Sequence, residues 1–246
     1  MSIEYSDVTN KDGLLQFIEF TLGFPDGYIT DNSTRKAQWT AILNVCLDRT
    51  LHTLYSADGK FQFDDANHSK NPFITFELTI NQKNYNLTND EQGNLILDIH
   101  AVYARQSTTS PYYLLEPRDM QSEGDTVFTD GITRLGWPTS YDKTGNLIKL
   151  DYTPSATVEN GLKALINREG SYFATSDTTK EAGFAGLYHE VLILEACYRY
   201  ARANNLVVKE TLKRDIGEMK EELIEYQSRR ARDERTVMSN EPIIYE

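Results

Sequence analysis

The spacing of hydrophobic residues changes twice along this chain of 246 residues. Near both ends, apolar residues recur at the interval expected for one face of an amphipathic helix. Between about residues 60 and 170, β-branched and aromatic residues follow a strand-like spacing, and polar turn clusters separate them. Helices flanking a run of strands indicate an α+β fold. We therefore expect the N- and C-terminal helices to form an antiparallel helical bundle, with a central β-rich insertion.

The expected helices lie in two pairs. Residues 9–22 fit a short helix, and residues 31–56 fit a longer one that Asp31 or Ser33 can cap. Two helices near the C-terminal end carry apolar seams of matching spacing, and a short linker joins them, which predicts antiparallel packing. Their seams are Leu187, Val191, Leu194, Tyr198 and Ala201 in the first, and Leu212, Ile216, Met219, Leu223 and Tyr226 in the second.

Residues 156–167 belong to the central segment, and their pattern leaves two states open. A helix and a strand both place apolar residues on one face there. Gly161 favours the strand slightly, because a glycine inside a helix costs about 1 kcal/mol relative to alanine. The helical face would hold Val158, Leu162 and Leu165, and the strand face would hold Val158, Leu162, Ala164 and Ile166.

These patterns divide the chain into three expected parts. Residues 1–56 and 172–232 form the helical bundle domain, and residues 57–171 form the β-rich insertion domain. Residues 233–246 form a C-terminal docking tail, in which Pro242 keeps the last helix from continuing.

The charge balance bears on the kind of partner that the chain can bind. With 37 acidic and 25 basic residues the net charge is −12. A dedicated duplex-DNA binder needs lysines and arginines to displace counterions from phosphates, so this balance argues against one. No apolar run is long enough for a transmembrane helix, and the first residues lack the pattern of a signal peptide. Cys46 and Cys197 lie in apolar helical patterns and are expected to be reduced core residues of a cytosolic protein.

The residue patterns give little sign of catalysis. Phosphate-binding glycine motifs and the Gly-x-Ser-x-Gly motif of acyl transfer are absent. Asp64, Asp65 and His68 lie close in sequence, but they are too few for a calcium loop, and a solvated turn is the simpler interpretation. We expect no catalytic residue, no cofactor and no metal site.

The most distinct cluster of like charges is a run of arginines near the end of the last helix. Cations at a helix C-terminus complement the macrodipole, for about 0.3–1 kcal/mol each. The same side chains can also form a docking patch for an acidic partner, directly before an apolar tail. The two interpretations are compatible. The residues are Arg229, Arg230, Arg232 and Arg235.

Several features between residues 131 and 203 follow one another in a familiar order. Gly136-Trp137-Pro138 leads into a turn and an aliphatic strand, and the Thr153-Pro154 step comes next. A helix beginning "LYHE" then continues into "YRYAR". In this order the features resemble the head-to-tail adaptor family of tailed bacteriophages. These connector proteins form the first ring beneath the portal, especially in short-tailed phages.

The resemblance implies a structural protein of the virion neck, assembled in the host cytoplasm. It would form a homo-oligomeric ring of about twelve copies between the portal protein and a tail or tail-hub protein. Genome DNA would pass through the lumen without specific binding, and no membrane would be involved. The region around Trp137 and Pro138 would be a rigid β element for stacking, with these two residues fixing the angle at which the chain enters it.

In such adaptors the C-terminal segment reaches the portal, so the end of this chain becomes the expected docking arm. An apolar segment tethered beyond a stable helix can add to the sheet edge or groove of a partner. The docking candidates are Arg229, Arg230, Arg232, Arg235, Val237, Ile243, Ile244 and Tyr245.

Two other classes of protein remain open at this stage. One is a tail-associated hydrolase that uses carboxylates such as Asp64 and Asp65. The other is a different virion ring or tail-completion protein. An enzyme is expected to turn over substrate as a monomer, whereas an adaptor is expected to show no turnover.

Overall fold

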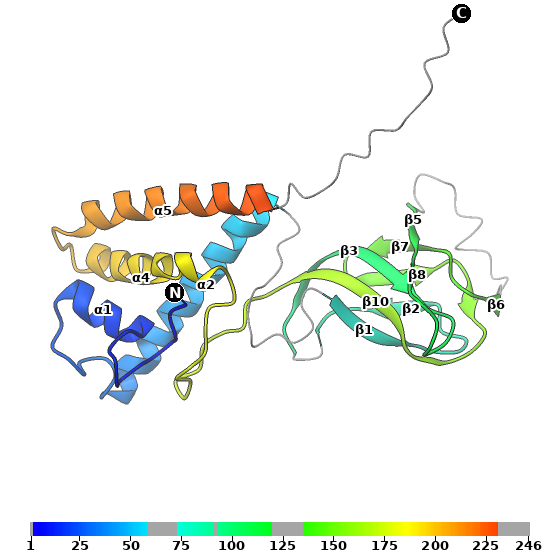
Figure 1. The fold of residues 1–246 in the computed structure, drawn as a ribbon, viewed down its shortest axis with the longest axis horizontal. Helices are drawn as coiled ribbons and strands as arrows, with labels where there is room; N and C mark the ends of the chain where they lie inside the picture. Colours follow the sequence, from blue (N-terminus) through cyan, green and yellow to red (C-terminus); the bar gives the residue numbers. More distant parts are fainter. Residues whose placement is uncertain (1, 59–72, 91–92, 120–134, 231–246) are drawn as a thin grey trace, which may run out of the picture.

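The computed structural model describes residues 2–58, 73–90, 93–119 and 135–230. Figure 1 shows an elongated molecule with helices in one half and strands in the other. The two ends of the chain build the helical half, and the middle builds the β half. The predicted α+β fold, with N- and C-terminal helices packed together and β-sheets between them in sequence, is confirmed.

In the described residues the helical half has four α-helices, preceded at α4 by a short 3-10 helix, η1 (Gly186–Tyr188). Helix α4 contacts α1, α2 and α5, and α2 also contacts α5. Helices α4 and α5 run antiparallel, as their matched seams predict (Figure 1). The helices are α1 (Leu14–Leu22), α2 (Ser33–Asp58), α4 (Glu190–Ala203) and α5 (Lys209–Arg230).

Five of the ten predicted seam residues are buried, and three more are partly buried against the same helical core. Val191, Ala201, Leu212 and Leu223 lie in one apolar cluster with residues of α1 and α2. The prediction for Leu187 is wrong, because it lies in η1 ahead of α4 and its side chain is 71% exposed.

Two predicted helix starts are also wrong. Helix α1 begins at Leu14 instead of residue 9, because the Asp7 carboxylate accepts hydrogen bonds from the N–H groups of Thr9 and Asn10 and holds a turn there. Helix α2 begins at Ser33, and the residue that caps it is Asn32, whose Oδ1 accepts from the Arg35 N–H at 3.0 Å.

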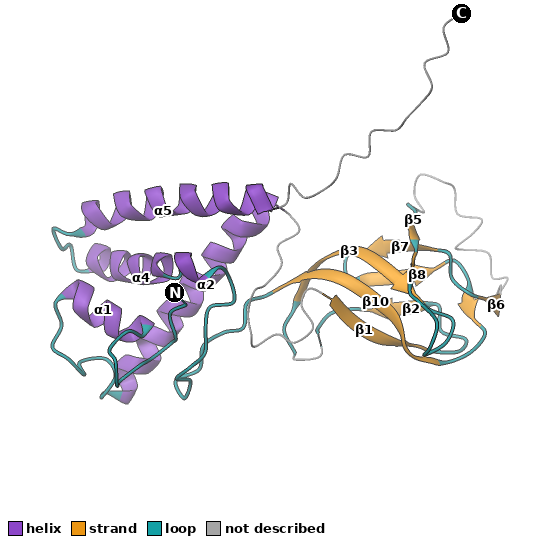
Figure 2. Cartoon of the chain, viewed as in Figure 1, coloured by secondary structure: helices purple, strands orange, loops and turns teal. Residues whose placement is uncertain are grey.

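The β half contains two four-stranded sheets and a two-stranded pair among the described residues (Figure 2). The strand orders are β1-β10-β3-β4, β2-β8-β7-β5 and β6-β9. Among these described strands, β5–β7 and β6–β9 pair in parallel and the other pairs are antiparallel. The strands are β1 (Phe73–Leu78), β2 (Asn84–Asn86), β3 (Ile96–Ala104), β4 (Tyr113–Leu114), β5 (Glu116–Pro117), β6 (Leu135–Gly136), β7 (Ser140–Thr144), β8 (Leu147–Leu150), β9 (Thr153–Pro154) and β10 (Val158–Arg168).

The two larger sheets share one apolar core. Ile74 of β1 and Val102 of β3 belong to the same buried cluster as Ile148 and Leu150 of β8. This cluster is separate from that of the helices, so each half buries its own apolar residues. The turn predicted before the aliphatic strand is short, because β7 continues to Thr144 and Gly145 and Asn146 alone connect it to β8.

Residues 156–167 adopt the strand state and belong to β10, between β1 and β3. Gly161 has a steric role, since a Cβ atom there would lie 2.5 Å from the Cβ of Leu78. Glycine therefore allows β10 to approach β1 closely. The predicted strand face is buried: Val158, Leu162, Ala164 and Ile166.

The chain returns to the helices directly after β10. Gly170 packs against Leu47 and Leu51 of α2, and an added Cβ would lie 2.6 Å from Leu51 Cδ1. Asn44 of α2 exchanges two hydrogen bonds with the backbone of Phe173, at 3.0 and 2.8 Å. These contacts attach the returning segment to α2.

Candidate interaction surfaces

The predicted docking arm begins at the end of α5. Arg229 is exposed and forms an ion pair with Glu225, one helical turn earlier. An exposed pair at this spacing contributes about 0.3–0.5 kcal/mol, so the arginine remains available to a partner. Arg230 is the last residue of α5, and nothing is described of its side chain. The remaining docking candidates lie outside the described residues: Arg232, Arg235, Val237, Ile243, Ile244 and Tyr245.

Trp137 and Pro138 lie between β6 and β7. Trp137 packs, half-buried, against the β core. Pro138 is buried, and its carbonyl accepts a hydrogen bond from the Tyr113 hydroxyl at 3.0 Å. Thr139 donates to the two carboxylate oxygens of Asp151, from its N–H at 3.0 Å and from its hydroxyl at 2.6 Å. The Thr139–Asp151 contact was not predicted, because polar residues at a turn give no periodic signal.

A polar hollow of about 710 Å³ opens beside β3 and β7. His100 lines it, with Nδ1 3.7 Å from the carboxylate of Asp98. Lys143 binds the same carboxylate and also donates to the Ile99 carbonyl at 2.9 Å. Burial alone would raise the pKa of Asp98, but the hydrogen bonds from Lys143 and the Ile99 N–H outweigh it and hold that pKa below its usual value.

The chemistry of this hollow fits a structural clasp better than a catalytic centre. Lys143 satisfies a carbonyl on β3, and Asn146 satisfies another, that of Ile96, at 2.8 Å. These side chains join β3 of one sheet to the β7–β8 hairpin of the other. No group of three or more metal-ligating side chains occurs within the described parts of the chain. The predicted carboxylates Asp64 and Asp65 lie outside those parts.

His189, the histidine of the "LYHE" sequence, is fully buried at the start of α4. Its Nδ1 accepts a hydrogen bond from the Ile3 N–H at 3.1 Å, and its Nε2 lies 2.9 Å from the carbonyl of Phe184, to which Nε2–H donates. The imidazole of His189 therefore joins the N-terminal segment to the loop before α4. The role of this residue is structural.

Sequence patterns did not reveal an apolar pocket of about 350 Å³ on α1, which we call the α1 pocket. Phe17, Phe20 and Phe24 supply its apolar lining, and an ion pair between Lys11 and Asp26 (2.9 Å) lies at its rim. Phe20 is 84% exposed. An exposed phenylalanine beside an apolar pocket indicates a surface that a binding partner can bury.

Hydrogen bonds and aromatic stacking fix the residues that line the α1 pocket. Glu19 of α1 is buried, and its carboxylate accepts hydrogen bonds from the N–H groups of Ile29 (2.6 Å) and Thr30 (3.1 Å). Phe24 stacks on Tyr28 with ring centroids 4.5 Å apart. The loop that follows α1 is therefore fixed before any partner arrives, which reduces the entropy lost on binding.

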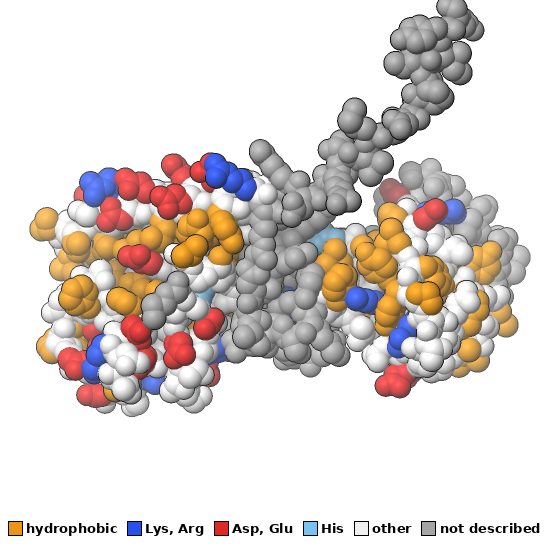
Figure 3. All heavy atoms as spheres, viewed as in Figure 1, with side chains coloured by type: hydrophobic (Ala, Val, Ile, Leu, Met, Phe, Trp, Pro, Cys, Tyr) orange, Lys and Arg blue, Asp and Glu red, His pale blue; other side chains and the backbone are white. Residues whose placement is uncertain are grey.

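Figure 3 shows hydrophobic side chains gathered over α1, α4 and α5, beside a charged edge along α5. Exposed apolar residues of this half include Phe20, Leu187 and Val207. None of the described helices is long and apolar enough to cross a membrane. Exposed apolar side chains gathered on one face are typical of a surface that binds a protein partner.

Comparison with models of known protein families gave no match to this chain, and neither did a search of curated proteins.

Proposed function

We propose that this chain is a structural virion protein, a head-to-tail adaptor whose ring joins the portal protein to the tail or tail hub. Genome DNA passes through the lumen of the ring. The proposal rests on the order of sequence features from Gly136-Trp137-Pro138 to the "YRYAR" helix. The structural observation that carries it is the uncovered apolar surface of the helical half, with Phe20 84% and Val207 95% exposed. Such surfaces are typical of subunits that associate.

The end of α5 and the residues after it form the arm that docks onto the portal. Arg229 and the arginines that follow it meet acidic groups of the portal, and Val237, Ile243 and Ile244 supply apolar contacts. A ring carries one arm per copy, so each arm needs only modest affinity.

The acidic balance fits a lumen through which DNA moves without adhering. The net charge of −12 repels phosphates and keeps non-specific DNA affinity low. Replacing lumen-facing carboxylates with lysine should slow DNA ejection. Unchanged ejection would show that the charge has no such role.

Affinity capture of a tagged full chain from its native lysate, with quantitative mass spectrometry, tests the proposed function. We expect a portal protein and a tail component in near-equal copy number to this chain. Removing residues 233–246 should abolish portal capture and leave the circular dichroism spectrum unchanged. Arg214→Ala on the exposed side of α5 is the matched control and should retain capture. Recovery of the chain alone, or with metabolic enzymes, rejects the adaptor.

The alternative is a tail-associated hydrolase. The observation that favours it is His100, which lines the polar hollow and lies 3.7 Å from the Asp98 carboxylate, since a histidine beside a carboxylate can serve as a general base. Incubating the purified chain with bacterial cell-wall material distinguishes the hydrolase from the adaptor. Turnover that His100→Ala abolishes would establish the hydrolase. Absence of turnover together with portal capture would support the adaptor.

A further inference from the structure

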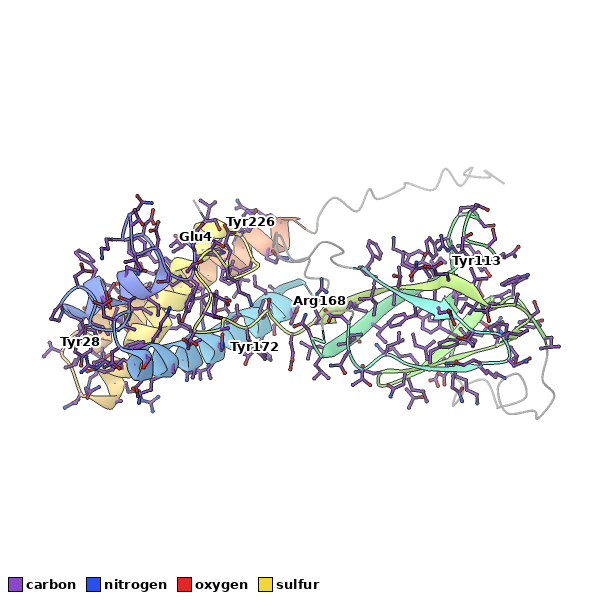
Figure 4. All side chains as sticks on the ribbon, turned by 90° about the horizontal axis from the view of Figure 1, so that it is seen from below. Glu4, Tyr28, Tyr113, Arg168, Tyr172 and Tyr226 are labelled. Carbon is purple, nitrogen blue, oxygen red and sulfur yellow. The ribbon has the colours of Figure 1, made fainter. Side chains whose placement is uncertain are left out.

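The α1 pocket and the connection between α4 and α5 lie at the same end of the molecule. Tyr28, which stacks on Phe24 of the pocket, lies at the end of the helical half that is far from the β half (Figure 4). Figure 1 shows the α4–α5 connection at that end as well. Copies standing side by side with the same orientation would therefore present both features at one level.

The α4–α5 connection, residues 204–208, carries an apolar projection, which we call the Val207 turn. Val207 is 95% exposed and Val208 is 37% exposed. The turn is held by a hydrogen bond from the Leu206 N–H to the Ala201 carbonyl at 2.8 Å, and Asn205 adopts a left-handed conformation with φ of 51°. An aliphatic side chain on a fixed turn is suited to fill a preformed apolar pocket.

The charges around the pocket and the turn are opposite in sign. The charged residues that line the pocket are Lys11, Asp26 and Glu19, so two carboxylates accompany one lysine. Beside the turn, Arg202, Lys209 and Lys213 accompany Glu210. The pocket rim is therefore net negative, and the flanks of the turn are net positive.

We propose that the Val207 turn of one copy inserts into the α1 pocket of the next copy. The contact joins two different surfaces and is therefore heterologous. A heterologous contact repeated from copy to copy generates a ring when its rotation closes, and this is the closure that the proposed adaptor requires. Opposite charges around the apolar contact set its register and accelerate association. The inference rests on the ring of the proposed function and specifies the surfaces that build it.

Disulfide trapping with the double variant Phe20→Cys/Val207→Cys tests this contact. Both side chains are highly exposed, so the substitutions should leave the fold intact, which circular dichroism can verify. The native Cys46 and Cys197 are buried and should give no background. The single variants Phe20→Cys and Val207→Cys are the matched controls. Each preparation is oxidised mildly, both as purified full chain at high concentration and in the assembly captured from native lysate.

The double variant should yield a ladder of covalent multimers beyond the dimer on a non-reducing gel, and each single variant should yield none. Raising the salt concentration before oxidation should weaken the ladder, because salt screens the charges around the contact. Dimers formed by either single variant would indicate a contact between identical surfaces and overturn the proposal. Absence of the ladder from both preparations would overturn it as well.

The outcome is separable from that of the proposed function. Portal and tail proteins recovered without a ladder would mean that the ring uses other surfaces, while the adaptor function stands. A ladder without portal or tail proteins would support this contact and reject the adaptor. The two readouts come from the same captured sample.

Discussion

Arg168 donates a hydrogen bond from Nη1 to Oδ2 of Asp90 over 2.7 Å, and both side chains are buried. Arg168 is the last residue of β10, and its carbonyl accepts a hydrogen bond from the Tyr55 hydroxyl of α2. It lies where the helical and β halves meet (Figure 4). One residue thus holds the β half through its side chain and the helical half through its backbone.

Arg168→Met should destabilise the protein by about 3–5 kcal/mol, because it removes the cation that faces a buried carboxylate. Urea unfolding at pH 7 measures the loss. Arg214→Met is the matched control, since the Arg214 side chain is 68% exposed, and it should change stability by less than about 0.5 kcal/mol. A loss below about 1 kcal/mol for Arg168→Met would show that the ion pair adds little to the joint.

His189→Ala should release the N-terminal segment from α4. The substitution removes the acceptor of the Ile3 N–H and the donor to the Phe184 carbonyl, for a loss of about 1–3 kcal/mol. Hydrogen exchange should become faster at Ile3, and unfolding should occur at lower urea. His52→Ala on the exposed side of α2 should leave both unchanged. Unaltered hydrogen exchange at Ile3 in His189→Ala would contradict the structural role assigned to the His189 imidazole.

Much of the fold could be predicted from hydrophobic periodicity. The existence of the helices and the buried part of the seams of α4 and α5 follow from helical spacing. The state of β10 could not be decided in this way, because its apolar residues satisfy two periods at once. Contact with β1 and β3 on either side decides it, and the close approach at Gly161 has no sequence signal beyond the glycine itself.

The surfaces were harder to predict than the elements. Phe17 and Phe20 lie in a segment that periodicity identifies as a helix, and only burial shows that they remain outside the core. Val207 lies in the short linker that the sequence predicts between the two C-terminal helices, and nothing in the pattern shows that its side chain is exposed. A pocket depends on which side chains the tertiary fold leaves uncovered, and local pattern does not determine this.

Cys46 and Cys197 should resist thiol reagents in the folded protein. Burial raises the pKa of each thiol to about 12, so the reactive thiolate is rare at pH 8. Labelling with a chromogenic disulfide should be slow in buffer and complete in urea. The folded-state pKa values lie above those of the unfolded chain. The cysteine contribution to stability is therefore present below about pH 8.5 and is lost as pH rises towards 12. Rapid labelling in buffer would show that the helical core opens readily.

The clasp between Asp98 and Lys143 should show the opposite dependence on pH. The pKa of Asp98 is held below its usual value in the folded state, so the unfolded chain takes up the proton first as pH falls. The stability from this carboxylate is therefore present above about pH 4 and is lost as pH falls through the folded-state value. Asp98→Asn should reduce stability at pH 7 by at most about 1 kcal/mol, because the side chain is 47% exposed and solvent screens the pair.

The same substitution should matter less in acid, since protonation has already removed the charge from the wild-type carboxylate. Urea unfolding of wild type and Asp98→Asn at pH 7 and near pH 3 measures the difference between them. Asp26→Asn, in the more exposed pair with Lys11, serves as the control and should cost less at pH 7. A difference for Asp98→Asn that grows as pH falls would mean that the carboxylate stabilises the fold through its protonated form. The clasp between the sheets would then be a neutral hydrogen bond instead of an ion pair.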